Sequence, residues 1–526
     1  MTHQTRFEFN RTSADNGFKR TSLRHVPADT VAGEHPVAPR ALATFIHMSD
    51  LHVCDAKSPA RVEFMDRFAD PDYPTSAEIE YVGTYRAQEF LTVQVVEAMV
   101  EAANFIDVGP LLGSKIDAVL ITGDVIDNGQ YNELSWYKAL MDGGPVSSGS
   151  GDSKIVEAAH GNHPSFADEH YYKPDGPAGS RVEELWGIVP VPGLDAAAHG
   201  EFLARGLRHK WLAIHGNHDA LLQGTVRPDE TLDSLATGDR KLSGIATGAD
   251  LKKVFEPFQE VGPADYPSAD LLTTVEVTPD PTRRFVDMSD WVAVHTDCDH
   301  DHGLDAGSAV AYWIRDFGEV RVIALDTVNE WGGWQGCIDR SQFNWLREQL
   351  ENSRGKYVVL TSHHPLQDLF NGYSPDGIDK PILKDEVSEL LSQYPNVIAW
   401  ISGHVHDHNI SFMKSDAGDW GFWQIRTASH MDWPQQSRII EIARSGDGRI
   451  AIGTKVFDHA GQPFLDLASL KLISRENLED PIQLAGISRL LAANDWQRHS
   501  GSNSLEVLEG KPEDRNAWLW LSDPLA

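Results

Sequence analysis

The chain has 526 residues, of which 41% are hydrophobic and 23% charged, so it is long and apolar enough to bury a sizeable core. Its formal net charge of −33 argues against broad contact with nucleic acid or an anionic membrane, because both require a basic surface. Three widely spaced cysteines do not form a disulfide framework and favour a reducing compartment. Residues 1–40 lack a secretory signal core, and no apolar run reaches membrane-spanning length. We therefore expect a cytoplasmic protein with no membrane partner, although a removed export signal remains an alternative.

The N-terminal part of the chain predicts an arm followed by a βαβ unit. Residues 1–40 are polar and show no clear periodicity, so we expect them to form the arm. An apolar strand is predicted at residues 41–48, a helix with one apolar stripe at 89–106, and a second buried strand at 116–122. In such a unit, ligands bind at the carboxyl ends of the strands.

Two long irregular stretches follow, and we predict that both are insertions that cover the active face as lid or cap elements. The first is glycine-rich and spans residues 141–206, and the second spans residues 221–302. Both are too long for ordinary connections between elements. A third strand, at residues 211–215, lies between them.

The second half of the chain contains shorter, closely spaced strands. They are predicted at residues 320–326, 357–361, 397–401, 422–426, 438–442 and 450–456, with a helix at 342–350. About nine strands interleaved with helices predict an α/β fold with two packed sheets flanked by helices. We therefore expect one main domain at residues 41–460 and a partly helical extension, without recognisable chemistry, at 461–526.

Five short polar clusters each follow an apolar run that is predicted to be a strand. They are Asp50-x-His52, Gly123-Asp124-x-x-Asp127, Gly216-Asn217-His218-Asp219, His363-His364-Pro365 and Gly403-His404-x-His406. Their carboxylates, imidazoles and amide are ligands that borderline divalent metals prefer. Most of these clusters carry little weight alone, but five in series indicate a phosphoester hydrolase with two metal ions.

The local spacing supports metal binding at several of these clusters. Alternate residues of an extended segment point to the same side, so Asp50 pairs with His52 and His404 pairs with His406. Asn217 offers a carbonyl oxygen to a metal, which leaves the adjacent His218 free to face the substrate.

Other polar and aromatic groups are weaker candidates. The stretch Gly161-Asn162-His163-Pro164 follows no strand and has proline in place of the acid, so we reject it as a ligand cluster. His160 or His163 remains a candidate for contacting the substrate. Residues 297–302 are rich in Asp and His, and we favour a solvated loop over a further cation site there. Trp331, Trp334, Tyr171 and Tyr172 are candidates for stacking on a base or sugar, although aromatic residues more often serve packing.

The ordered series Asp-x-His, Gly-Asp-x-x-Asp, Gly-Asn-His-Asp, His-x-Pro and Gly-His-x-His resembles the motifs of the calcineurin-like metallophosphoesterase superfamily. The resemblance extends from about residue 45 to about residue 427 and leaves out the arm, the insertions and the C-terminal extension. It implies a four-layer αββα sandwich of two mixed β-sheets flanked by helices. It also implies a dinuclear metal centre at the ends of the strands.

The resemblance also implies a role for each residue of the motifs. One metal would be held by Asp50, His52 and His406, the other by Asn217, His363 and His404, with Asp124 bridging both. The residues alone leave His363 and His364 as alternatives, and the family's ligand is usually the histidine two residues before the proline. His218 would be the histidine that faces the substrate, and Asp127 the acid that pairs with it.

The identity of the metals is only partly constrained by the resemblance. Purple acid phosphatases place tyrosine where this chain has Asp127, so we do not expect a purple ferric centre. Two divalent ions drawn from Mn, Fe and Zn remain as candidates, because affinity order alone does not decide which metal a site holds.

The expected reaction is hydrolysis of a phosphoester by a metal-bound hydroxide, with His218 as proton donor and Asp127 as its partner. We expect a small phosphodiester of the cyclic-nucleotide or glycerophosphodiester type, because the chain looks most like bacterial enzymes with the His-His-Pro motif. A phosphomonoesterase or nucleotidase is one alternative, and a non-catalytic binding protein on the same fold is another. The expected partner is thus a small phosphorylated substrate, without nucleic acid, and the sequence does not determine the oligomeric state.

Overall fold

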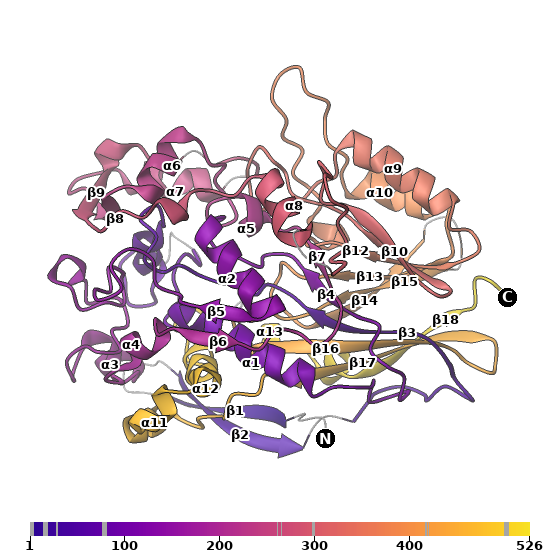
Figure 1. The fold of residues 1–526 in the computed structure, drawn as a ribbon, viewed down its shortest axis with the longest axis horizontal. Coiled ribbons are helices and arrows are strands. Elements are labelled where there is room, and N and C mark those ends of the chain that lie inside the picture. The colour runs from indigo at the N-terminus through magenta and orange to yellow at the C-terminus, as the bar shows by residue number, and fades with distance from the viewer. Residues whose placement is uncertain are drawn as a thin grey trace.

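The computed structural model describes residues 5–13, 19–27, 30–75, 82–259, 261–264, 266–296, 300–415, 418, 420–498 and 504–526. Two six-stranded mixed sheets form its centre, and helices flank them (Figure 1). This arrangement confirms the α/β class and the four-layer αββα sandwich with two mixed sheets.

The first sheet has the strand order β18-β17-β16-β3-β4-β7. Its strands are β18 (Ala517–Ser522), β17 (Arg449–Asp458), β16 (Gln436–Arg444), β3 (Arg40–Met48), β4 (Ala118–Thr122) and β7 (Trp211–Ile214). Strands β3, β4 and β7 run parallel, while β16, β17 and β18 pair antiparallel. Helix α1 (Thr92–Asn104) connects β3 to β4, which confirms the predicted βαβ unit.

The second sheet has the order β10-β11-β12-β13-β15-β14. Its strands are β10 (Trp313–Phe317), β11 (Val320–Ala324), β12 (Tyr357–Thr361), β13 (Val397–Ser402), β15 (Gly421–Arg426) and β14 (Asn409–Lys414). The four central strands are parallel, and an antiparallel strand closes each edge. Helices α9 (Arg340–Glu351) and α10 (Lys384–Leu391) cover the face that points away from the first sheet (Figure 1).

The remaining helices surround the first sheet and the insertions. They are α2 (Tyr131–Asp142), α3 (Arg181–Trp186), α4 (Leu194–Ala198), α5 (Asn217–Ala220), α6 (Glu230–Thr237), α7 (Leu251–Gln259), α8 (Met288–Thr296), α11 (Arg475–Leu478), α12 (Pro481–Ala492), α13 (Leu505–Glu509) and α14 (Pro512–Arg515). Among the residues described, no helix combines the length and the apolar character that crossing a membrane requires.

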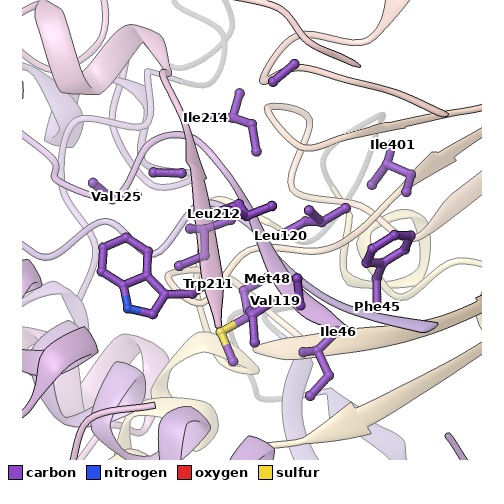
Figure 2. Packing of buried hydrophobic residues seen from close by; sticks show 14 of the residues in the cluster. Phe45, Ile46, Met48, Val119, Leu120, Val125, Trp211, Leu212, Ile214 and Ile401 are labelled. Atoms are coloured by element: carbon purple, nitrogen blue, oxygen red, sulfur yellow. The ribbon is translucent and has the colours of Figure 1, made fainter. Parts of the chain in front are cut away.

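The main core lies between the two sheets. Figure 2 shows how side chains of β3, β4 and β7, such as Phe45, Leu120 and Leu212, pack in one cluster with Ile401 of β13. All five residues of β4 are buried. Parallel strands that are covered on both faces read as continuous apolar runs, which is why these strands can be recognised from the sequence.

Several strands were not predicted from the sequence. A hairpin of β1 (Thr5–Ser13) and β2 (Lys19–Pro27) lies in the N-terminal segment, before the strand that was predicted to be first. Edge strands β10, β14 and β18 were also missed; β10 and β14 contain polar residues at several positions, whereas β18 is apolar and lies in the part of the chain that was expected to be a partly helical extension. The insertions are only partly irregular, since they contain the hairpins β5 (Gly144–Val146) with β6 (Phe202–Ala204) and β8 (Arg240–Ile245) with β9 (Leu272–Glu276).

Candidate metal centre

The seven predicted metal ligands lie at the carboxyl ends of five strands, three in the first sheet and two in the second. Asp50 and His52 follow β3, Asp124 follows β4, Asn217 follows β7, His363 follows β12, and His404 and His406 follow β13. Ligand atoms from six of them, all except Asn217, form groups whose members lie within 4.8 Å of one another. The two sheets thus place residues from distant parts of the chain around one point.

The backbone at these strand ends adopts conformations that are rare for residues with a side chain. Five predicted ligands have positive φ angles: Asp50 (51°), His52 (44°), Asp124 (48°), His404 (72°) and His406 (63°). A backbone in this region is strained for a non-glycine residue and occurs mostly at functional sites. Close approach matters as well, because a Cβ on Gly403 would lie 1.8 Å from Ser49 Oγ.

The first group of ligands consists of Asp50, His52 and His406. His406 Nε2 lies 3.3 Å from Asp50 Oδ1 and 3.1 Å from His52 Nε2. The opposite ring nitrogen of each histidine faces a carboxylate, Asp127 at 3.1 Å for His52 and Asp432 at 2.6 Å for His406. A carboxylate at Nδ1 favours the proton on that nitrogen, which leaves the two Nε2 lone pairs directed toward each other.

The second group is built around Asp124, His363 and His404. His363 Nε2 lies 3.1 Å from Asp124 Oδ2 and 3.2 Å from His404 Nδ1. His363 Nδ1 donates to the Thr122 carbonyl oxygen at 2.8 Å, so its Nε2 atom is the one available to a ligand. Asp124 Oδ2 also lies 3.9 Å from His52 Nε2, so this carboxylate contacts both groups.

Asn217 supplies a direct test of whether these residues fit a metal ion. Its amide nitrogen donates to the Gly224 carbonyl oxygen at 3.0 Å, which fixes the orientation of the amide. Its Oδ1 atom is buried and has no hydrogen-bond partner. An unpaired buried carbonyl oxygen is costly, and a cation beside it removes that cost.

The electrostatics of the site favour a cation in the same way. Burial lowers the pKa of His363, but Asp124 and Asp50 outweigh it and raise that pKa to about 9. Burial likewise lowers the pKa of His406, and Asp50 and Asp432 raise it to about 9. A field that retains a proton on a buried histidine also attracts a metal ion. The residues therefore fit a centre of divalent metals with oxygen and nitrogen ligands.

The structure distinguishes the two candidates in the His-His-Pro motif. Both ring nitrogens of His364 have protein partners, Thr327 Oγ1 at 2.8 Å and the Trp334 carbonyl oxygen at 2.9 Å. His363, by contrast, directs Nε2 toward Asp124. Although the ligand atoms of His363, His364 and His404 lie within 4.8 Å of one another, this bonding favours His363 as the ligand.

His218 and Asp127 lie together, but their main contact differs from the expected carboxylate–imidazole pair. His218 Nδ1 bonds to the main-chain carbonyl oxygen of Asp127 at 2.7 Å, while the carboxylate lies 3.6 Å away. That carboxylate accepts from His52 at 3.1 Å and from Arg61 Nη1 at 2.5 Å. Asp127 therefore orients His52 through its side chain and His218 through its backbone.

Several residues that contact the ligands, or the carboxylates that orient them, were missed by the sequence analysis. Asp432, Arg61, Arg86 and Arg498 are charged and largely buried, and each belongs to a loop outside the five motifs. Asp432 lies in the loop after the predicted strand at 422–426, so its position after a strand was the only available signal. Cys54 also lies beside these residues, because its Sγ atom contacts the Asp127 carboxylate at 3.5 Å.

The weaker candidates mostly serve packing. His160 is buried and stacks on Phe90 at a centroid distance of 4.4 Å, whereas His163 is exposed. Tyr171 and Tyr172 are buried in a hydrophobic cluster. Trp334 is different, because it is 39% exposed and stacks on the His404 ring at 5.8 Å.

The loop that is rich in Asp and His is not fully solvated, which corrects the reading favoured from the sequence. His302 is buried and stacks on Trp211 at 3.5 Å, and its ligand atom lies within 4.8 Å of ligand atoms of Asp142 and His300. Both Asp142 oxygens already accept from donors, Trp211 Nε1 and Lys138 Nζ. Residues 297–299 of this loop lie outside the described part of the chain.

Comparison with known proteins gives partial matches. A probable glycerophosphodiester phosphodiesterase of Arcobacter nitrofigilis is 32% identical over 93 residues, which are 18% of this chain and 33% of that protein. Human tartrate-resistant acid phosphatase type 5 is 30% identical over 81 residues, 15% of this chain and 22% of the phosphatase. The chain thus spans a third or less of the length of these relatives. A dimetal phosphatase structure from Danio rerio has a TM-score of 0.27 at 13% identity, covering 80% of this chain and 100% of that one, which is too low to support an argument.

A family model matches part of the chain. Residues 192–408 match the model described as calcineurin-like phosphoesterase. This range contains Asn217, His218, His363, His404 and His406, and the structure brings Asp50, His52 and Asp124 to the same centre from outside it. This part of the chain is therefore similar to the calcineurin-like phosphoesterase family.

Proposed function

We propose that this protein is a metal-dependent phosphoester hydrolase that acts on a small phosphodiester. The observation that carries the proposal is the convergence of predicted ligands from five strand ends, with Nε2 of His52 and of His406 facing each other at 3.1 Å. Asp50, His52 and His406 would hold one divalent ion, Asn217, His363 and His404 the other, and Asp124 would bridge them. The donor set of carboxylate, imidazole and amide suits Mn, Fe or Zn.

Two bound divalent ions would supply a nucleophile at neutral pH and neutralise charge on the attacking and leaving oxygens of an in-line displacement. The protein contributes the orientation of the groups around that reaction. The Asp127 and Asp432 carboxylates fix the rings of His52 and His406. Asp124 Oδ1 accepts from the His218 main-chain nitrogen at 2.8 Å, which ties the substrate-side histidine to the centre.

His218 is the proposed proton donor to the leaving group. Burial lowers its pKa to about 4, although Asp124 and Asp127 oppose this, so the free imidazole is neutral at pH 7 with its proton on Nδ1. A phosphate anion beside Nε2 favours the charged form and raises that pKa. His218 would therefore take up a proton when the substrate binds, and it would then donate this proton to the leaving group.

The preference for a diester is supported by the relative named as a probable glycerophosphodiester phosphodiesterase. A phosphomonoesterase is the second candidate, supported by the relatives named as tartrate-resistant acid phosphatase. The net charge of −33 supports a small phosphorylated substrate rather than nucleic acid. A non-catalytic binding protein would need no proton donor, so a role of His218 in turnover would distinguish the hydrolase from that alternative.

The test combines metal content with turnover of two model esters. The purified protein is loaded with Mn²⁺, and hydrolysis of bis-p-nitrophenyl phosphate and p-nitrophenyl phosphate is measured. We expect two bound ions and faster turnover of the diester. Faster turnover of the monoester would favour the phosphatase, and a metal-loaded protein that hydrolyses neither ester would exclude the hydrolase.

Replacement of the proposed proton donor gives a sharper test. We expect His218→Ala to retain both ions and to lose roughly 10²–10⁴-fold in turnover of a diester with a poor leaving group. The loss should be smaller for a p-nitrophenyl leaving group, which needs little protonation. His163→Ala is the matched control, because His163 is exposed and its cluster was rejected. Full activity of His218→Ala on the poor leaving group would remove His218 from the mechanism.

A further inference from the structure

The ligand His406 is held by a carboxylate that lies outside the five motifs. His406 Nδ1 bonds to Asp432 Oδ2 at 2.6 Å, and Asp432 is fully buried in the loop after β15. The Asp432 main-chain nitrogen donates to Ser429 Oγ at 2.9 Å, which fixes the loop around this carboxylate. The Asp432 side chain therefore determines both the orientation of the His406 ring and which of its nitrogens carries the proton.

Two arginines from distant parts of the chain hold Asp432 in turn. Arg86 Nε bonds to Asp432 Oδ1 at 2.6 Å, and Arg498 Nη2 bonds to Asp432 Oδ2 at 2.6 Å. Arg86 precedes α1, whereas Arg498 follows α12 in the C-terminal extension. Both arginines thus form ion pairs with the same buried carboxylate.

The same arrangement occurs on the other side of the first ligand group. His52 Nδ1 bonds to Asp127 at 3.1 Å, and Asp127 accepts from Arg61 Nη1 at 2.5 Å. Two imidazoles that face each other are thus each supported by a buried carboxylate and at least one arginine. The repetition indicates that a carboxylate held by arginine orients each of these two histidines.

The C-terminal extension is firmly docked where it supplies Arg498. Helix α12 packs against α1 and contributes Leu484, Ile487 and Leu490 to a hydrophobic cluster that includes Phe90. Two residues before Arg498, Trp496 Nε1 donates to Asp70 Oδ1 at 2.7 Å. Arg498 itself is only 3% exposed. Its contact with Asp432 is therefore a built part of the structure.

We propose that Arg498 is a positioning residue for the metal ligand His406, acting through Asp432, and that the C-terminal extension is consequently part of the metal centre. Loss of the Arg498 side chain removes one of the two arginines that hold the Asp432 carboxylate, so Asp432 fixes the orientation of the His406 ring less firmly. This inference rests on the metal centre of the proposed function and is independent of the substrate.

The test measures metal binding rather than turnover. Full-length protein is freed of metal by a chelator and titrated with Mn²⁺ in a calorimeter. We expect two ions to bind the wild type, and one of them to bind about 10–100-fold more weakly to Arg498→Gln. Arg498→Lys retains the positive charge and should recover part of that loss. If Arg498→Gln does not fold, Asp432→Asn removes the same carboxylate charge and should weaken the same ion.

Arg489→Gln is the matched control. Arg489 is also a buried arginine of the extension, but it contacts the Gln435 carbonyl oxygen at 3.1 Å and Asp458 at 3.3 Å. We expect its Mn²⁺ affinities to equal those of the wild type. The inference is overturned if a folded Arg498→Gln binds both ions with wild-type affinity, or if Arg489→Gln weakens binding equally. A wild type that binds two ions but hydrolyses no ester would refute only the proposed function.

Discussion

At the residue scale, Asp195 is a buried carboxyl group whose surroundings control its charge. Burial raises its pKa, and the neighbouring Asp175 adds to the shift, so that the pKa reaches about 8. An unfolded chain loses this proton near pH 4. Between pH 4 and pH 8 the folded protein therefore binds one more proton than the unfolded chain at this site. The contribution of Asp195 to stability is present at low pH and is lost as the pH rises toward 8.

Replacement of Asp195 by asparagine removes this titration. We expect the wild type to lose stability between pH 6 and pH 8 and Asp195→Asn to lose about 1–2 kcal/mol less over that interval. Urea unfolding at the two pH values measures the difference. Asp376→Asn is the control, because Asp376 is an exposed carboxyl group and its replacement should leave the pH dependence unchanged. Equal pH dependence of Asp195→Asn and the wild type would show that Asp195 is ionised in the folded protein.

The residues of the metal centre differ in how far the sequence could predict them. Asp50 and His52 follow a continuous apolar strand, and such a strand end is visible in the sequence. Asp432 follows a predicted strand less closely and Arg498 follows none, and their contact joins positions that are 66 residues apart. The Asp127 carboxylate was expected to pair with His218, but it contacts His52, while His218 bonds to the main-chain carbonyl oxygen of Asp127. Only side-chain geometry reveals this difference.

At the element scale, buried strands and amphipathic helices were predicted well and edge strands poorly. The strand predicted at 357–361 coincides with β12, and the helix predicted at 342–350 lies within α9. The β18 strand was missed, although its residues Ala517–Ser522 complete the first sheet beside β17. Pairing between strands that are distant in sequence is decided by tertiary contacts, so local patterns do not contain it.

The docking of α12 depends on a glycine that lets two backbones touch. A Cβ on Gly486 would lie 1.8 Å from the Gln462 carbonyl oxygen, which belongs to the loop beneath the helix. Alanine is the better helix former by about 1 kcal/mol, but the clash requires α12 or the loop to move. The position therefore exchanges intrinsic helix stability for close packing of the C-terminal extension.

We expect Gly486→Ala to lower the free energy of unfolding by about 1–3 kcal/mol, because the cost of displacement exceeds the gain in helix propensity. Since α12 leads to Arg498, the variant should also bind Mn²⁺ more weakly. Urea unfolding and calorimetric titration measure the two effects. Gly355→Ala is the control, because a Cβ there meets no atom within 4 Å, and it should stay within about 0.5 kcal/mol of the wild type. An equally stable Gly486→Ala would mean that the contact relaxes without cost.

At the scale of the whole molecule, the metal centre lies between the two sheets and joins them. Asp50, His52, Asp124 and Asn217 come from the first sheet, and His363, His404 and His406 come from the second. Without a cation, this junction brings the Nε2 atoms of His52 and His406 to 3.1 Å from each other and leaves Asn217 Oδ1 unpaired. A bound cation would pair with these atoms and so stabilise the junction between the sheets.

Metal should therefore stabilise the fold as a whole. An ion that binds the folded protein and not the unfolded chain adds about 2.7 kcal/mol per site when its free concentration is 100-fold above Kd. We expect a chelator to lower the Tm and added Mn²⁺ to raise it in a concentration-dependent manner, as measured by differential scanning calorimetry. His404→Ala removes a ligand from the second sheet, so its response to Mn²⁺ should be smaller. His163→Ala removes a histidine outside the centre and should respond as the wild type does. A wild-type Tm that is independent of Mn²⁺ would contradict a metal-bridged junction between the sheets.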